Sequence, residues 1–179
     1  MKKALLIASV LFIAVISTAC INNIAVQELN NKAAEYMQKG DYEAAVNRLQ
    51  ASIDLDSSMY ETYYNLGIAA TKAKKYEVAV DALQQGIKIN PDHVDFYYSL
   101  AVAQAEWASS IEEDEEEDEK QKLSQEEVAQ IQSLRESAIL NAEKYLSSAS
   151  QIEDKEEIEQ FIKELQETEK EEQPVLLKG

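Results

Sequence analysis

The sequence predicts an all-α protein built as a helix–turn–helix solenoid, and three observations lead to this fold class. Residues 40–46 are echoed by residues 74–80, 34 residues further along the chain. Within each copy the apolar side chains recur at intervals of three and four residues, which is the period of one helix face. The chain has only four Gly and two Pro, and it lacks the apolar–polar alternation that marks strands. A fixed period of this length is typical of stacked helix pairs.

The two copies define repeat units at 26–59 and 60–93, which share one pattern of apolar and small residues. Unit one carries Leu29, Ala33, Tyr36, Gly40, Tyr42, Ala45 and Leu49, and unit two carries Tyr63, Leu66, Gly67, Tyr76, Ala79, Leu83, Gly86 and Pro91. This pattern resembles the tetratricopeptide repeat (TPR) family, although unit one has Lys32 where leucine is usual and Ser57 in place of the closing proline. The resemblance implies a close helix crossing with Gly67 against Ala79, because a larger side chain would overpack it.

A third unit follows at 94–152, and an acidic insertion at about 109–137 interrupts it. Its first helix is expected to begin at Val94, whereas the residues that match the second helix of the other units come late, from Ala142 onward. Part of the insertion has helical spacing, in Val128, Ile131, Leu134 and Ala138. We therefore expect a helical hairpin longer than its neighbours.

The tip of this hairpin is predicted to be an acidic loop at 111–122. Eight consecutive positions of it are acidic: Glu112, Glu113, Asp114, Glu115, Glu116, Glu117, Asp118 and Glu119. Such a run is interpreted either as a solvated, self-repelling loop or as a docking strip for a basic partner.

An amphipathic helix is predicted at 153–172, after the third unit. Its apolar stripe consists of Ile158, Phe161, Ile162 and Leu165, and its other faces are polar. A solenoid needs a terminal cap with a polar outer face, and this helix suits that role. Residues 173–179 are expected to form a tail.

The N-terminus has the organisation of a secretory signal peptide at 1–19. Two lysines precede a 13-residue run at 4–16 that is apolar except for Ser9, and this run is short for a membrane span. Cys20, the only cysteine, stands where bacterial lipoproteins carry their lipidated cysteine, so the segment resembles their leader, with Ser17 in place of a leucine-like residue. Residues 20–25 would then be the tether of a lipid anchor. Ordinary cleavage that releases the protein, and an uncleaved anchor, stay open.

The composition argues against nucleic-acid binding and against catalysis. The formal net charge is −17, and phosphate binding needs the opposite sign. His93 is the only histidine, so the usual zinc ligands are lacking, and no phosphate-binding loop or nucleophile elbow occurs. We expect no enzyme, no cofactor and no metal site.

In TPR proteins the first helix of each unit lines a concave groove. By repeat position, the resemblance assigns Glu61, Tyr64, Asn65, Ile68 and Lys72 of unit two, Asp95, Tyr98, Ser99 and Val102 of unit three, and Gln27, Asn30, Asn31, Ala34 and Gln38 of unit one to this groove. Tyrosines are frequent energetic anchors of interfaces, although these could also simply cover the core. Some TPR domains clamp a C-terminal carboxylate with basic and amide side chains, and here only Asn65 fits that pattern. A partner segment with apolar and basic side chains is therefore expected.

The predicted function is that of a protein–protein adaptor or scaffold, exported and membrane-anchored, for the assembly of envelope complexes. The membrane would be the outer membrane, on its periplasmic face, in a cell with two membranes, and otherwise the outer face of the plasma membrane. Two alternatives stay open. One is a structural or spacer protein of the envelope that associates with its own copies, and the other is binding of a basic partner by the acidic tip.

Overall fold

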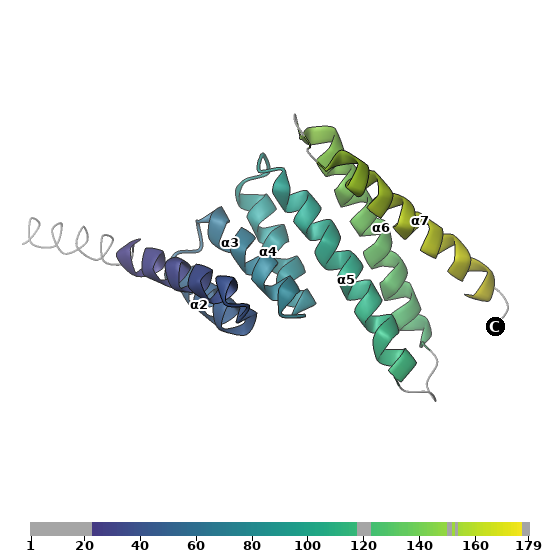
Figure 1. Cartoon of the computed structure of the whole chain (residues 1–179), viewed down its shortest axis with the longest axis horizontal. Coiled ribbons are helices and arrows are strands. Elements are labelled where there is room, and N and C mark those ends of the chain that lie inside the picture. The colour runs from purple at the N-terminus through teal and green to yellow at the C-terminus, as the bar shows by residue number, and fades with distance from the viewer. Residues whose placement is uncertain (1–22, 118–122, 150–151, 153, 177–179) are drawn as a thin grey trace, which may run out of the picture.

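The computed structural model describes residues 23–117, 123–149, 152 and 154–176, and over these residues its regular structure is entirely helical. A first helix covers residues 23–38. It is followed by α2 (Tyr42–Leu55), α3 (Tyr60–Lys72), α4 (Tyr76–Ile89), α5 (Asp95–Glu117), α6 (Gln125–Ser148) and α7 (Lys155–Leu176). The helices lie side by side in chain order, as Figure 1 shows. The all-α solenoid that the sequence predicts is confirmed.

The turns inside the first two helix pairs have the same geometry. Gly40 has a φ of 75°, and Lys74, its counterpart 34 residues later, has a φ of 56°. In both turns the next backbone N–H donates to a carbonyl five residues back, from Asp41 to Tyr36 and from Lys75 to Ala70. A left-handed residue just past a helix end is the usual way to close such a turn, and glycine adopts it without strain.

Two glycines let large side chains approach the helix backbone closely. A Cβ atom on Gly67 would lie 2.4 Å from Cγ of Leu83, and one on Gly86 would lie 2.1 Å from Cε1 of Phe96. Leu83 and Phe96 are fully buried. The expected neighbour of Gly67 was Ala79, but its nearest neighbour is the larger Leu83, one turn further along α4. The glycines therefore make room for core side chains from the neighbouring helix.

The third helix pair is longer than the others, and one expectation about it was wrong. α5 continues to Glu117, so the described part of the predicted acidic loop, residues 111–117, is helical. Residues 118–122, including Asp118 and Glu119, lie outside the described residues. Acidic side chains on an exposed helix can be solvated while the backbone hydrogen bonds continue, which explains why the charge run does not end the helix.

The helical part of the insertion and the late second helix are one continuous helix, α6. It begins with a capping box, in which Ser124 Oγ accepts from the backbone N–H of Glu127 at 3.2 Å and the Glu127 carboxylate accepts from the N–H of Ser124 at 2.8 Å. It ends at Ser148, so Ile152, which was expected to continue its apolar face, lies beyond it. α5 and α6 run antiparallel and extend past the ends of α3 and α4 (Figure 1).

Two polar contacts join α5 and α6 along this hairpin. The Nδ2 of Asn141 donates to Oε1 of Gln104 at 2.9 Å, and Nη2 of Arg135 donates to both carboxylate oxygens of Glu112. Gln104 and Arg135 are buried. A shift of one helix along the other would leave these buried groups without their partners, so the two contacts fix the register of the hairpin.

The C-terminal helix is longer than predicted. α7 extends to Leu176, so residues 173–176, which were expected to belong to a tail, are helical. Residues 177–179 lie outside the described residues, as do the predicted signal peptide and Cys20. Among the helices that can be described, none has the length and apolar character needed to cross a bilayer.

Candidate functional site

The first helices of units two and three, α3 and α5, enclose a hollow of about 280 Å³. Its lining consists of Tyr64, Ile68, Thr71, Lys72, Tyr98, Ser99 and Val102. We call it the central groove. Six of the nine residues that the resemblance assigned to units two and three line it, so the repeat positions place these six side chains together. Glu61, Asn65 and Asp95 are not part of its lining.

Thr71 belongs to the central groove but was not predicted. It is buried, and its hydroxyl donates to the carbonyl of Gly67 at 2.9 Å, one turn back in α3. When a threonine hydroxyl donates to a carbonyl of its own helix in this way, the methyl group of the side chain points away from that hydrogen bond. Its position on the helix, three residues after Ile68, was the signal that could have identified it.

An aromatic cluster holds Tyr64 in position. The ring of Tyr64 meets Phe96 edge-on at 5.2 Å and His93 edge-on at 5.4 Å between centroids. Its hydroxyl lies 3.5 Å from Oγ of Ser99, which donates to it from α5. Edge-to-face packing of this kind fixes ring orientation. Tyr64 is therefore a pre-positioned side chain, half-buried, with one end available to the groove.

His93 and Asp95 support this cluster from the junction between units two and three. His93 packs against the rings of Tyr60, Tyr64 and Phe96 at centroid distances of 5.3–5.4 Å. Its Nε2 lies 3.9 Å from Oδ2 of Asp95. Asp95 therefore lies beside His93 rather than in the groove lining.

Tyr98, the second tyrosine of the groove, is packed against the C-terminal helices. Its ring lies 5.5 Å from that of Tyr145 in α6 and meets that of Phe161 in α7 edge-on at 6.2 Å. Burial raises the pKa of the Tyr98 phenol, and the negative charges of Glu157 and Asp154 raise it further. The predicted capping helix thus packs through Phe161 against a tyrosine that lines the groove, a contact that the repeat pattern did not reveal.

Carboxylates act on the tyrosines near the same end of the groove. The pKa of Tyr145 is also raised, first by burial, next by the charge of Asp95, and further by Tyr64, Asp154 and Tyr98. Three carboxylates therefore act on the two phenols, while Lys72 is the one cation in the groove lining. A ligand group with positive charge would be favoured near these carboxylates.

A second hollow, of about 420 Å³, lies further along α5 and reaches α7. Its lining consists of Lys74, Tyr76, Ala105, Glu106, Ser109, Ser110, Glu113, Phe161, Glu164, Leu165 and Thr168. We call it the distal cleft. Its walls are the turn between α3 and α4, the lengthened part of α5, and α7. None of its residues was predicted as a site residue except Glu113, which was assigned to the acidic tip.

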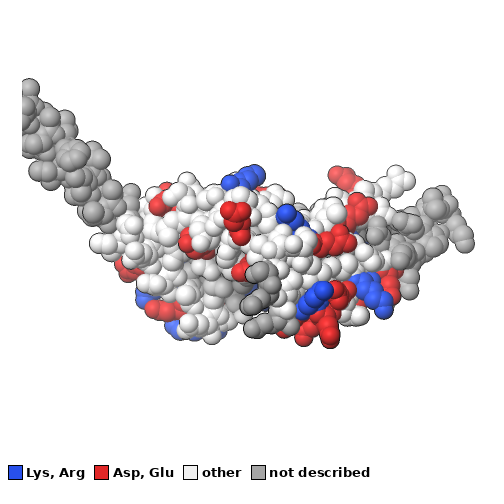
Figure 2. Space-filling model, turned by 90° about the horizontal axis from the view of Figure 1, so that it is seen from above, with Lys and Arg blue, Asp and Glu red and all other residues white. Residues whose placement is uncertain are grey.

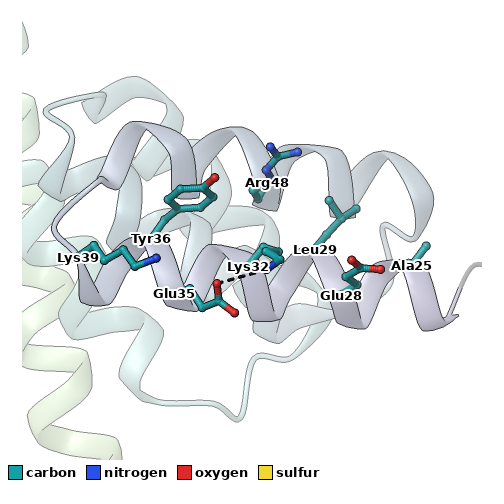
Figure 3. Close-up of a pocket in the computed structure, with 8 residues that line it drawn as sticks. All are labelled: Ala25, Glu28, Leu29, Lys32, Glu35, Tyr36, Lys39 and Arg48. Atoms are coloured by element: carbon teal, nitrogen blue, oxygen red, sulfur yellow. Dashed lines mark hydrogen bonds and ion pairs between the residues drawn. The ribbon is translucent and has the colours of Figure 1, made fainter.

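A third hollow, of about 680 Å³, lies at the N-terminal end of the solenoid between the first helix and α2 (Figure 3). Its side chains are mostly charged, and Lys32 pairs with Glu35 at 3.3 Å. The counterparts of Lys32, Glu35 and Arg48 in unit two are Leu66, Ala69 and Ala82, which are buried. In unit two these positions are apolar and are covered by the preceding repeat. In unit one, which no described repeat precedes, the same positions are charged and exposed, as expected of a terminal repeat.

Asn30, which was expected to line the groove in unit one, lies between helices instead. Its Nδ2 is 3.0 Å from Oγ of Ser52 in α2 and 3.2 Å from Oγ1 of Thr62 in α3. Ser52 and Thr62 are buried. This residue therefore joins units one and two, and a repeat-position argument missed it because a polar side chain at that position can point either way.

Charged residues are interspersed over the surface and form no continuous cationic field on the face shown in Figure 2. Within the described ranges, no group of three His, Cys, Asp or Glu side chains is arranged to hold a metal ion. The arrangement of the central groove, with an apolar floor, two fixed phenols and carboxylates at one end, can bind a peptide side chain.

Comparisons with known proteins agree with this architecture. The family model of the TPR repeat matches residues 33–73 and 69–106, so this part of the chain is similar to TPR repeats. No curated protein sequence matches the chain.

Three solved structures share the fold at low identity. The first TPR of Spaghetti (RPAP3) bound to HSP90 peptide SRMEEVD is 16% identical, with a TM-score of 0.59 over 80% of this chain and 91% of that one. The TPR2B domain of yeast Sti1, in a complex with pHsp70, is 18% identical, with a TM-score of 0.60 over 81% and 98%. The Arabidopsis OM64 TPR domain is 15% identical, with a TM-score of 0.60 over 80% and 98%.

Proposed function

We propose that this protein is a non-enzymatic adaptor that binds a segment of a partner protein in the central groove. The observation that carries the proposal is the pairing of Tyr64 and Tyr98, which occupy the same position in successive repeats and face one hollow with Ile68 and Val102. The aromatic packing orders both rings before binding, which lowers the entropy that association costs. Tyrosine rings that are ordered in this way serve as anchors at interfaces.

Two of the similar structures hold peptide or protein partners, which supports a peptide ligand for this groove. One is bound to HSP90 peptide SRMEEVD and the other is a complex with pHsp70. The charges around the central groove favour a ligand other than an acidic peptide. Lys72 is the one cation of the groove lining, and the carboxylates of Asp95, Asp154 and Glu157 act on its tyrosines or on their neighbour Tyr145. We therefore propose a partner segment with apolar and basic side chains.

Selection of peptides from a random phage-displayed library tests this function. The wild-type protein is expected to enrich peptides that share an apolar or aromatic anchor. The double variant Ile68→Arg/Val102→Arg fills the groove with charge and is expected to bind these peptides more than about tenfold more weakly. Leu140→Arg is the matched control, because Leu140 is 65% exposed on α6 and outside the groove. Circular dichroism checks that all variants keep their helicity.

The second part of the proposal concerns location. We propose that the protein is exported and anchored in a membrane through a lipidated Cys20, and that it acts in the assembly of envelope complexes. The apolar run at 4–16 and the single cysteine four residues after its end support this. Metabolic labelling with an alkyne fatty acid tests it: the wild type is expected to become labelled and to sediment with membranes, whereas Cys20→Ser should lose the label. Unlabelled wild-type protein would contradict the lipid anchor.

A further inference from the structure

One face of α5 runs through both the central groove and the distal cleft. Tyr98 and Val102 line the groove, and Glu106, Ser109 and Glu113 line the cleft. These residues follow one another at intervals of three or four, so they share one helix face. From Tyr98 to Glu113 this face spans about 22 Å at the helical rise. The two hollows are therefore successive parts of one surface.

The distal cleft exists because the third hairpin is long and because α7 stands away from α5. α3 ends at Lys72, whereas α5 continues to Glu117. α7 packs its backbone chiefly against α6, and its Phe161 and Leu165 reach the cleft from the far side. A solenoid whose third hairpin matched the first two would lack this wall.

The cleft is apolar at its base and negatively charged at its rim. Ala105, Phe161 and Leu165 supply the apolar part, and Ser109, Ser110 and Thr168 supply hydroxyls. Three carboxylates line it against a single cation, Lys74. Glu113 is exposed and Glu106 half-exposed.

These charges are not neutralised within the described part of the chain. Neither Glu106 nor Glu113 forms an ion pair there, and the only side-chain partner of the Glu164 carboxylate is the amide of Gln160, at 2.9 Å. Uncompensated carboxylates around an apolar base complement a segment that carries both apolar and cationic side chains.

We propose that the partner segment bound in the central groove continues along α5 into the distal cleft, where Glu106, Glu113 and Glu164 select lysine or arginine side chains. This inference rests on the proposed function, because it takes the central groove as the anchor of the same segment. The occupant is a basic, amphipathic stretch of another protein. The selectivity resides in α5 and α7, and of the three carboxylates Glu106 occupies a regular repeat position, that of Lys72 in unit two.

Fluorescence polarisation with defined peptides tests the inference. The probe is a peptide enriched by the wild-type groove, made with a short extension of Lys, Gln or Glu residues at either end. Only one end of the bound peptide can point toward the distal cleft. With the extension at that end, the Lys peptide is expected to bind about tenfold more tightly than the Gln peptide at low salt, and the Glu peptide more weakly than the Gln peptide. The advantage should shrink as ionic strength rises.

Two charge-matched triple variants separate the cleft from the overall charge. Glu106→Gln/Glu113→Gln/Glu164→Gln is expected to abolish the preference for the Lys extension and to leave the affinity for the unextended peptide within about twofold. Glu126→Gln/Glu136→Gln/Glu143→Gln removes the same charge from exposed positions on α6 and is expected to keep the preference.

Three outcomes would overturn the inference. They are equal binding of the Lys and Gln forms at both ends, a preference that survives in the cleft variant, and a preference that the α6 variant also loses. A self-association of the chain that the cleft variant breaks and the Lys peptide competes away would assign the cleft to a second copy instead. Failure of the proposed function is recognised separately, because the unextended peptide would then bind the Ile68→Arg/Val102→Arg variant as tightly as the wild type.

Discussion

Nη2 of Arg135 lies 2.7 and 2.6 Å from the two carboxylate oxygens of Glu112, and the Arg135 side chain is only 5% exposed. This ion pair joins α5 to α6 near the end of the long hairpin. It also removes Glu112 from the acidic run to which the sequence assigned it, since its carboxylate faces α6 rather than a partner. Charge-assisted hydrogen bonds to a buried guanidinium are stronger than those between neutral groups.

Replacement of Glu112 tests the structural role of this pair. Glu112→Gln is expected to lower the free energy of unfolding by about 1–3 kcal/mol, because a buried guanidinium loses an anionic acceptor. Urea unfolding followed by circular dichroism measures it. Glu113→Gln, the adjacent and exposed residue, should change the stability by less than about 0.5 kcal/mol. Equal effects of the two substitutions would show that Glu112 behaves as a surface acid.

The contact between Gly86 and Phe96 gives a second stability prediction. Gly86→Ala places a methyl group where the Phe96 ring lies 2.1 Å away, so the ring or helix must shift. Overpacking typically costs about 1–3 kcal/mol, whereas the higher helix propensity of alanine contributes about 1 kcal/mol. The cost is the larger of the two where the surrounding side chains cannot move aside. We expect a net loss in urea unfolding.

A double-mutant cycle with Phe96→Leu identifies the cause of that loss. Phe96→Leu alone should destabilise the protein, because it leaves a cavity. In its presence Gly86→Ala should cost less or become stabilising, since the smaller side chain leaves room for the methyl group. Additive effects of the two substitutions would mean that the ring does not limit residue 86.

The environment of Tyr98 predicts its titration. Burial and the charges of Glu157 and Asp154 raise the pKa of this phenol above 10.0. Because the folded-state pKa is the higher one, the contribution of Tyr98 to stability is present below about pH 10 and is lost as the pH rises through the folded-state value. Ultraviolet absorbance of phenolate, as the difference between wild type and Tyr98→Phe, follows the titration.

Neutralising one carboxylate checks the electrostatic part of that shift. Glu157→Gln should lower the apparent pKa of Tyr98, and Glu156→Gln, at an adjacent exposed position, should leave it unchanged. An unchanged titration in Glu157→Gln would place that carboxylate away from the groove and would weaken the argument for a negative groove end.

The charged N-terminal face predicts that this end of the solenoid does not stack on another copy. Lys32→Leu/Glu35→Ala/Arg48→Ala installs the residues that unit two has at these positions and should create an apolar end. We expect the wild type without residues 1–19 to sediment as a monomer and the triple variant to associate as its concentration rises. Association of the wild type that the triple variant does not change would favour the structural or spacer role.

The repeat pattern was sufficient to predict the fold and most of the central groove. Its period places Tyr64 and Tyr98 on equivalent helix faces, so six groove residues could be assigned without coordinates. Repeat position says nothing about elements outside the repeat, and this is why the distal cleft was missed. α7 was recognised as a cap, but only the packing of Phe161 on Tyr98 reveals that it also supports a side chain of the groove.

The acidic run shows where composition misleads. Eight consecutive acids suggest an unstructured loop, because like charges repel one another. Packing between α5 and α6 outweighs this repulsion, and α5 stays helical up to Glu117. One face of α5 is buried in this packing, where Ala108 contacts Ile131 and Leu134 of α6. Pairing between distant helices is a tertiary effect, so the sequence within 112–119 could not show it.

The most direct test of the central claim is the affinity of the Ile68→Arg/Val102→Arg variant for a peptide that the wild type selects. We predict that this variant, with wild-type helicity, binds the peptide more than about tenfold more weakly, while Leu140→Arg binds it like the wild type. Undiminished binding by the folded groove variant would contradict the account, because the partner segment would then contact a surface other than the central groove.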